Sequence, residues 1–71
     1  MWLWYDWRAA AVADSEGNIL DVEEWDGYKD TDSVCNRMDM IANQAVTPEA
    51  ERLSERFPDA KLRSVSYTHL R

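Results

Sequence analysis

The chain has 71 residues, of which 45% are hydrophobic, and a formal net charge of −6. Its length allows one small domain, and its four tryptophans argue against a disordered tail. Nine of the 14 acidic residues fall within residues 1–32, and such a segment repels phosphate backbones. The charge therefore argues against direct nucleic-acid binding and makes a basic protein surface the more natural partner.

Cys35 is the only cysteine, which excludes an internal disulfide and favours a reducing, cytoplasmic setting. We expect a buried structural thiol at this position. A structural zinc site needs about four ligands, and Cys35 with His69 cannot supply them, so we predict no metal and no cofactor. The N-terminus has neither a basic leader nor a long apolar run, which argues against a signal peptide and a membrane span.

Residues 2–13 predict a β-strand because most of their side chains suit a pleated, half-buried surface. Side chains alternate between faces, so Leu3 and Tyr5 share one side while Trp2 and Trp4 share the other. Both faces are apolar. We therefore expect this strand to be covered on both sides, by a helix on one face and by another element or a partner on the other.

Residues 14–18 predict a turn, since Asp14 can bond to downstream backbone and Gly17 can adopt a positive φ. Residues 19–25 then return as the second strand of an antiparallel hairpin. In this strand apolar and acidic side chains alternate cleanly, which predicts a half-solvated strand near the edge of the sheet. The apolar side is Leu20 and Val22, and the acidic side, which we expect to face solvent, is Asp21 and Glu23.

A first helix is predicted over about residues 34–45, with a cap supplied from residues 31–33. Its apolar stripe is narrow and consists of Val34, Met38, Ile41 and Ala45. Met38 and Ile41 fit either core contacts against the sheet or a methionine-containing docking face.

A second helix is predicted over about residues 48–57, with Thr47 as its cap and Pro48 at its first position. A further strand begins at about residues 61–63. The expected fold class is therefore α+β, with a small antiparallel or mixed sheet that starts with the hairpin over about residues 2–13 and 19–25, followed by the two helices.

Asp6, Asp14 and Asp21 could in principle converge on a metal, as in nucleases with a ribonuclease-H-like sheet, although their spacing is not diagnostic. The first hairpin also resembles that of actin-like ATPases. Those proteins need a Gly/Thr/Ser turn that binds phosphate, whereas the corresponding residues 7–10 here are Trp-Arg-Ala-Ala. No nucleophile elbow or glycine-rich phosphate loop is present. We expect a non-enzymatic domain.

Residues 65–71 read Val-Ser-Tyr-Thr-His-Leu-Arg and resemble a translated transposon adapter from sequencing libraries. In this reading frame the codon before the adapter can encode only Ser, Pro, Thr or Ala, and residue 64 is a serine. We therefore expect residues 1–64 to be a truncated N-terminal interaction domain and residues 65–71 a non-native tail. Tyr67 and His69 would then carry no functional information; the alternative is a genuine C-terminal strand.

The order of features from Met1 to about Leu62 resembles the N-terminal domain of the archaeal Nop family. The resemblance is carried by the aromatic first strand, the hairpin Ala-Val-Ala-Asp-Ser-Glu-Gly-Asn-Ile-Leu, the helix over residues 34–45, the Val-Thr-Pro-Glu junction at residues 46–49, and Phe-Pro-Asp-Ala-Lys-Leu at residues 57–62. It rests on this pattern and on no invariant motif. The family is the scaffold of the box C/D guide-RNA ribonucleoprotein that 2′-O-methylates RNA, with a role in rRNA processing.

The resemblance implies a non-catalytic domain that docks a fibrillarin-type methyltransferase. Guide RNA and the kink-turn protein would be bound only through C-terminal domains beyond this segment. Partner contacts are then expected from interface-type side chains, and the candidates are Trp25, Tyr28, Met38 and Ile41. Two alternatives remain open: a fragment of a ribonuclease-H-like or actin-like enzyme, and a stand-alone acidic adaptor.

Overall fold

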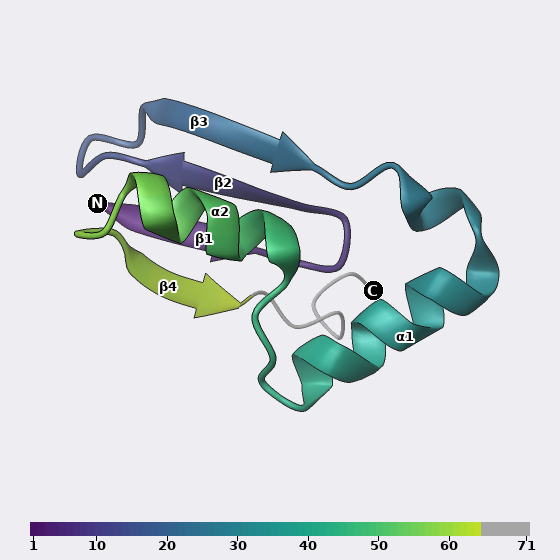
Figure 1. The fold of residues 1–71 in the computed structure, drawn as a ribbon. Helices are drawn as coiled ribbons and strands as arrows, with labels where there is room; N and C mark the ends of the chain where they lie inside the picture. The colour runs from purple at the N-terminus through teal and green to yellow at the C-terminus, as the bar shows by residue number, and fades with distance from the viewer. Residues whose placement is uncertain (65–71) are drawn as a thin grey trace.

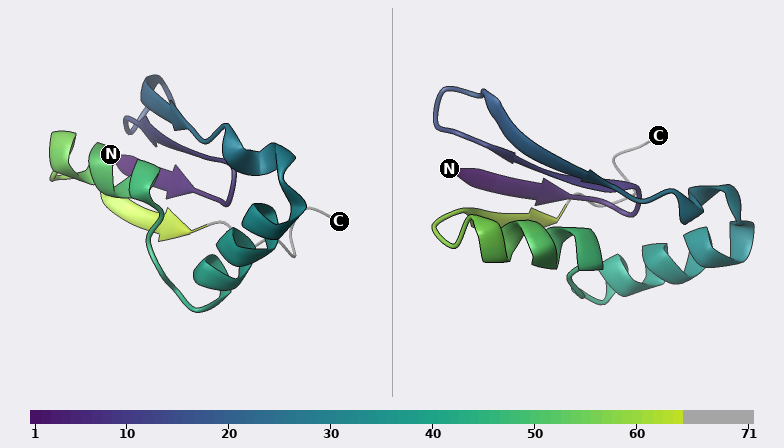
Figure 2. Two further views of the ribbon diagram at one scale, coloured as in Figure 1. Left: turned by 45° about the vertical axis from the view of Figure 1, so that its right-hand side comes forward. Right: turned by 45° about the horizontal axis from the view of Figure 1, so that its top comes forward.

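The computed structural model describes residues 1–64, and the prediction of an adapter-derived tail at residues 65–71 lies outside them. The described chain forms a four-stranded mixed sheet with two α-helices on one side (Figures 1 and 2). The strands are β1 (Trp2–Tyr5), β2 (Ala9–Ala13), β3 (Ile19–Glu24) and β4 (Lys61–Ser64), in the order β3-β2-β1-β4. β4 is parallel to β1 and the other pairs are antiparallel, which confirms the predicted α+β class.

The single strand predicted over residues 2–13 is wrong, because a tight turn at Trp7 and Arg8 divides it into β1 and β2. Asp6 builds this turn. Its carboxylate accepts hydrogen bonds from the backbone N–H groups of Arg8 at 2.7 Å and Ala9 at 3.0 Å. The sequence hides the turn because no glycine or proline marks it and Trp7 favours a strand.

The turn between β2 and β3 confirms the predicted one. The Asp14 carboxylate accepts hydrogen bonds from the backbone N–H groups of Glu16 and Asn18, each at 2.9 Å, and Gly17 has a φ of 88°. These bonds, those from Asn18 first, lower the pKa of Asp14. β3 lies at the edge of the sheet, as predicted.

Helix α1 (Thr31–Ala42) begins and ends about three residues earlier than predicted. Asp30 takes the cap position instead of residues 31–33, and its carboxylate accepts a hydrogen bond from Ser33 Oγ at 2.7 Å. The helix ends because Gln44 has a φ of 66° and donates its N–H to the Ile41 carbonyl at 2.9 Å. The expectation of a buried thiol is also wrong, because Cys35 is exposed on this helix.

Helix α2 (Pro48–Arg56) confirms the predicted second helix. The buried Thr47 hydroxyl caps it by accepting the Ala50 N–H at 3.4 Å, and Pro48 occupies the first turn. α2 lies across β1, β2 and β3, and it carries Ala50 and Leu53 into the core. The chain then continues into β4, which the sequence also predicted.

The core lies between α2 and one face of the sheet. Leu3 and Tyr5 of β1 point into it, whereas Trp4 between them is 43% exposed on the other face. The described chain places both helices on the first face and none on the second (Figure 2). The predicted helix cover of one face is confirmed, residues 1–64 supply no helix to cover the other face, and cover by a partner stays a prediction. The remaining buried core residues are Ala10, Val12, Ile41, Ala50 and Leu53.

None of the helices within residues 1–64 is both long and apolar enough to cross a bilayer.

We predict that Leu3→Ala lowers the free energy of unfolding by about 2–5 kcal/mol, because it leaves a cavity under α2. Trp4→Ala is the matched control on the same strand, and it should cost about 1 kcal/mol or less because its side chain faces outward. Urea denaturation followed by far-UV circular dichroism measures both. Equal losses would mean that Trp4 is packed in the core.

Candidate functional site

The four partner-binding residues predicted from the sequence do not form one surface. Ile41 is 6% exposed and belongs to the core, so it is not available to a partner. Met38 is half-buried on α1, and Tyr28 is 49% exposed in the short 3₁₀ helix η1 (Gly27–Lys29). Trp25 is half-buried and covers an arginine of α1. Tyr28 is thus the most exposed of the four.

Trp25 belongs to a cluster that attaches α1 to the rest of the domain. Its ring lies 4.1 Å from the Arg37 guanidinium carbon, a cation–π contact. Arg37 in turn donates two hydrogen bonds to the Glu49 carboxylate of α2, at 2.6 and 3.0 Å. Both charged side chains are nearly buried, at 12% and 5% exposed. This bidentate pair fixes α1 against α2.

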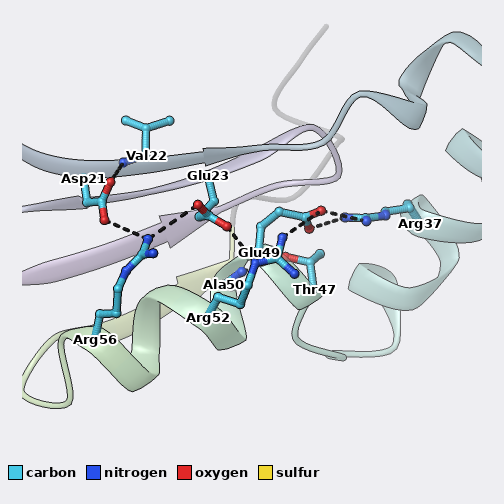
Figure 3. Close-up of polar contacts among 9 residues, drawn as sticks. All are labelled: Asp21, Val22, Glu23, Arg37, Thr47, Glu49, Ala50, Arg52 and Arg56. Carbon is cyan, nitrogen blue, oxygen red and sulfur yellow. Dashed lines mark hydrogen bonds and ion pairs between the residues drawn. The ribbon is translucent and has the colours of Figure 1, made fainter.

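The Arg37–Glu49 pair is one end of a longer row of alternating charges, which we call the charge ladder (Figure 3). Arg52 lies 3.9 Å from Glu49 and 2.7 Å from Glu23. Arg56 lies 3.5 Å from Glu23 and 2.7 Å from Asp21. The ladder therefore joins β3, α2 and α1 through Asp21, Arg56, Glu23, Arg52, Glu49 and Arg37.

The ladder lowers the pKa values of two of its carboxyl groups. The hydrogen bond from Arg52 is the main cause for Glu23. Burial is the largest single influence on Glu49 and opposes its charged form, but the hydrogen bonds from Arg37, a backbone hydrogen bond and the charges of Arg37 and Arg52 together outweigh burial, so the pKa of Glu49 is lowered overall. Both groups therefore stay ionised to a lower pH than an ordinary glutamate does.

The charge ladder reverses the predicted orientation of β3. Asp21 and Glu23 were expected to face solvent, but they point toward the arginines of α2 (Figure 3). Because neighbouring side chains alternate, Leu20 and Val22 are turned to the helix-free side, where they are 47% and 45% exposed. The expectation of solvent-facing acids is therefore wrong, and the solvent side of β3 is apolar.

The helix-free side of the sheet, called the open face below, collects exposed aromatic and aliphatic side chains. The strand register places Val22, Ala11, Trp4 and Arg63 in one row across all four strands. The alanines of β2 are small, so they leave a hollow of about 200 Å³ beside Trp4 and Val22. By register, the open face consists of Trp2, Trp4, Ala9, Ala11, Ala13, Ile19, Val22, Lys61 and Arg63. Leu20 lies at the register shift of β3 and has no partner in register, and we include it because it alternates with Asp21 and is exposed.

Charges mark the two edges of the open face. At the β4 edge the Lys61 ammonium and the Arg63 guanidinium lie 5.5 and 5.7 Å from the Trp2 ring centroid. At the β3 edge Glu24, exposed and paired in register with Ala9, supplies a negative charge. An apolar centre with cations on one side and an anion on the other suits a protein surface better than a small molecule.

The three carboxylates that could have formed a metal site each have another partner. Asp6 bonds to its own turn and to Arg8, Asp14 bonds to its own turn, and Asp21 pairs with Arg56. Across residues 1–64 no group of three His, Cys, Asp or Glu side chains is placed to hold a metal ion. These three carboxylates thus have structural contacts.

Comparison with known proteins gives no assignment: no protein-family model, curated protein sequence or solved structure matches the chain.

Sequence reasoning missed Trp4, Leu20 and Val22 as site residues. A signal for them was present, because residues 2–5 carry large apolar side chains on both faces and only one face can meet α2. Nothing in the local pattern of β3, however, reveals that its acidic side faces a helix. That depends on the arginines of α2, about 30 residues later in the chain.

We predict that Arg37→Met lowers the free energy of unfolding by about 3–5 kcal/mol, because it leaves the buried Glu49 carboxylate without its partner. Arg8→Met is the control: Arg8 is 50% exposed and its pair with Asp6 should contribute less than about 1 kcal/mol. Chemical denaturation at pH 7 compares the two. A small loss for Arg37→Met would show that the pair does not hold α1.

The lowered pKa of Glu49 predicts acid sensitivity. As pH falls, the unfolded chain binds this proton before the folded chain does, so stability is present above about pH 4.5 and is lost below it. Arg37→Met removes the hydrogen bonds and the charge that do most to lower this pKa, so the difference in stability between the variant and the parent chain should narrow as pH falls. Denaturation midpoints between pH 7 and pH 3 test this, and a constant gap would contradict it.

Proposed function

We propose that this domain is a non-catalytic docking module that binds another protein through the open face of its sheet. The observation that carries the proposal is the exposure of Trp4, Leu20 and Val22 together on the side that the helices leave bare. Contiguous exposed apolar side chains mark interaction surfaces in soluble proteins, and tryptophan is enriched among residues that dominate binding energy.

The edges of the open face favour one docking orientation. A partner element with an acidic group near Lys61 and Arg63 and a basic group near Glu24 would match both edges. Such charges contribute more to orientation and association rate than to affinity. The apolar centre supplies the affinity, because burial of apolar surface stabilises a complex by roughly 25 cal/mol per Å² before the costs of association.

The proposed partner is a fibrillarin-type RNA 2′-O-methyltransferase. Its support is the resemblance of residues 1–62 to the N-terminal domain of the Nop family, and it rests on sequence pattern. In this proposal the domain positions the methyltransferase within a box C/D guide-RNA particle, while RNA is contacted by other domains. The candidates Trp25 and Tyr28, which line a hollow with Ala9 and Glu24, would then lie beside the interface, with Tyr28 the more accessible of the two. Met38 lies on α1, on the helix side of the sheet, and would lie outside this interface.

Binding of the chain to an archaeal fibrillarin-type methyltransferase, measured by isothermal titration calorimetry, tests the proposal. Trp4→Ser should weaken binding by roughly 30-fold, the effect of a residue that contributes about 2 kcal/mol. Leu20→Ser should weaken it several-fold. The matched control is Leu62→Ser, because Leu62 is equally exposed at 47% on an edge strand but faces the opposite side of the sheet.

Two results would contradict the proposal in different ways. No binding by the folded parent chain would reject the methyltransferase as partner. Binding that is weakened by Leu62→Ser and unaffected by Trp4→Ser would retain the partner and reject the open face as the docking surface. Circular dichroism of each variant shows that it is folded, so that a loss of affinity is not a loss of structure.

A further inference from the structure

A second apolar surface lies on the helix side of the sheet, in a groove between α2 and β4. α2 lies over β1, β2 and β3, and the side chain of Leu62 on β4 faces the same side but remains 47% exposed. The groove has a volume of about 290 Å³ and is lined by Val46, Glu51, Ser54, Glu55 and Leu62. It is separate from the open face, which lies across the sheet.

The charge ladder gives α2 two electrically different sides. Arg52 and Arg56 point toward β3, where they pair with its acids. Glu51 and Glu55, one helical turn apart and both exposed, line the groove on the β4 side instead. The salt bridges of residues 1–64 do not include either carboxylate. The groove therefore combines an apolar floor with a negative rim that the arginines of its own helix do not neutralise.

We propose that this groove binds an amphipathic helix of a partner protein, with lysine or arginine residues flanking its apolar stripe. The negative charge of the rim determines which partner helix is favoured, because basic flanking residues pair with Glu51 and Glu55 and acidic ones are repelled. The place of the groove beside α2 favours a helix, since helices pack side by side on a sheet about 8–10 Å apart. Val46 and Leu62 would contact the apolar stripe.

This surface is independent of the proposed methyltransferase contact. A strand added to the free edge of β4 would use backbone groups and would not depend on Glu51 or Glu55. A nucleic acid or an anionic membrane would be repelled by the same two carboxylates. The groove therefore fits a basic amphipathic helix, with Glu51 and Glu55 at its basic flanks and Val46 and Leu62 against its apolar stripe.

The test uses the full chain and a labelled helical peptide of about 18 residues, or five turns, with leucines on one face and lysines flanking them. Fluorescence anisotropy at low salt should show saturable binding, and a scrambled peptide of the same composition should bind much more weakly. Glu51→Gln with Glu55→Gln should weaken binding by roughly three- to tenfold, as expected for two exposed ion pairs. Leu62→Ser should weaken it to a similar degree.

Two controls separate the groove from general charge attraction and from the open face. Glu16→Gln with Asp59→Asn changes the net charge equally at exposed positions outside the groove and should leave binding unchanged. Leu20→Ser should also leave it unchanged. Circular dichroism shows that each variant is folded.

The proposal would be overturned in favour of non-specific charge attraction by either of two results. One is that the two double variants, in the groove and outside it, weaken peptide binding equally; the other is that the scrambled peptide binds as tightly as the amphipathic one. Self-association of the chain that Leu62→Ser abolishes, seen by sedimentation, would overturn it in favour of a second copy as occupant. Failure of this test leaves the open-face proposal intact, because that proposal predicts sensitivity to Trp4→Ser and Leu20→Ser and none to Leu62→Ser.

Discussion

The arrangement of this domain depends on the charge ladder that runs from β3 along α2 to α1. Its buried end, the bidentate Arg37–Glu49 pair under Trp25, is the main polar link between α1 and α2. Its exposed end fixes which side of β3 faces the helix. A buried ion pair contributes little compared with apolar packing, but removing one partner is costly because it strands the other charge. The ladder therefore specifies geometry more than it supplies stability.

Two surfaces follow from this geometry. Because the acids of β3 turn inward to the arginines of α2, Leu20 and Val22 are turned outward and join Trp4 on the open face. Because Arg52 and Arg56 are directed to β3, the opposite side of α2 keeps unneutralised carboxylates beside Leu62. The same ion pairs thus leave an apolar face on one side of the sheet and an acid-rimmed groove on the other.

The distribution of polar groups is consistent with a binding role. Asp6 and Asp14 each build a turn, and Glu49 holds α1, so these carboxylates are occupied by contacts within the fold. Among residues 1–64, in contrast, Trp4, Leu20 and Val22 remain 43–47% exposed. For a small domain such exposure is unfavourable in isolation, and a partner that covers it stabilises the folded state by binding linkage.

The sequence alone determined the local structure of much of the chain. The Asp14–Gly17 turn, the Thr47–Pro48 start of α2 and the edge position of β3 follow from residue types that act on near neighbours. It also determined that Leu3 and Tyr5 share a face. The Asp6 turn escaped prediction because Trp7 favours a strand and a single aspartate formed the turn. Only the tertiary structure decided which face of β3 is buried, whether Ile41 is accessible, and where Trp25 lies. These outcomes depend on contacts between side chains that are distant in the sequence, and a local sequence pattern carries no information about such contacts.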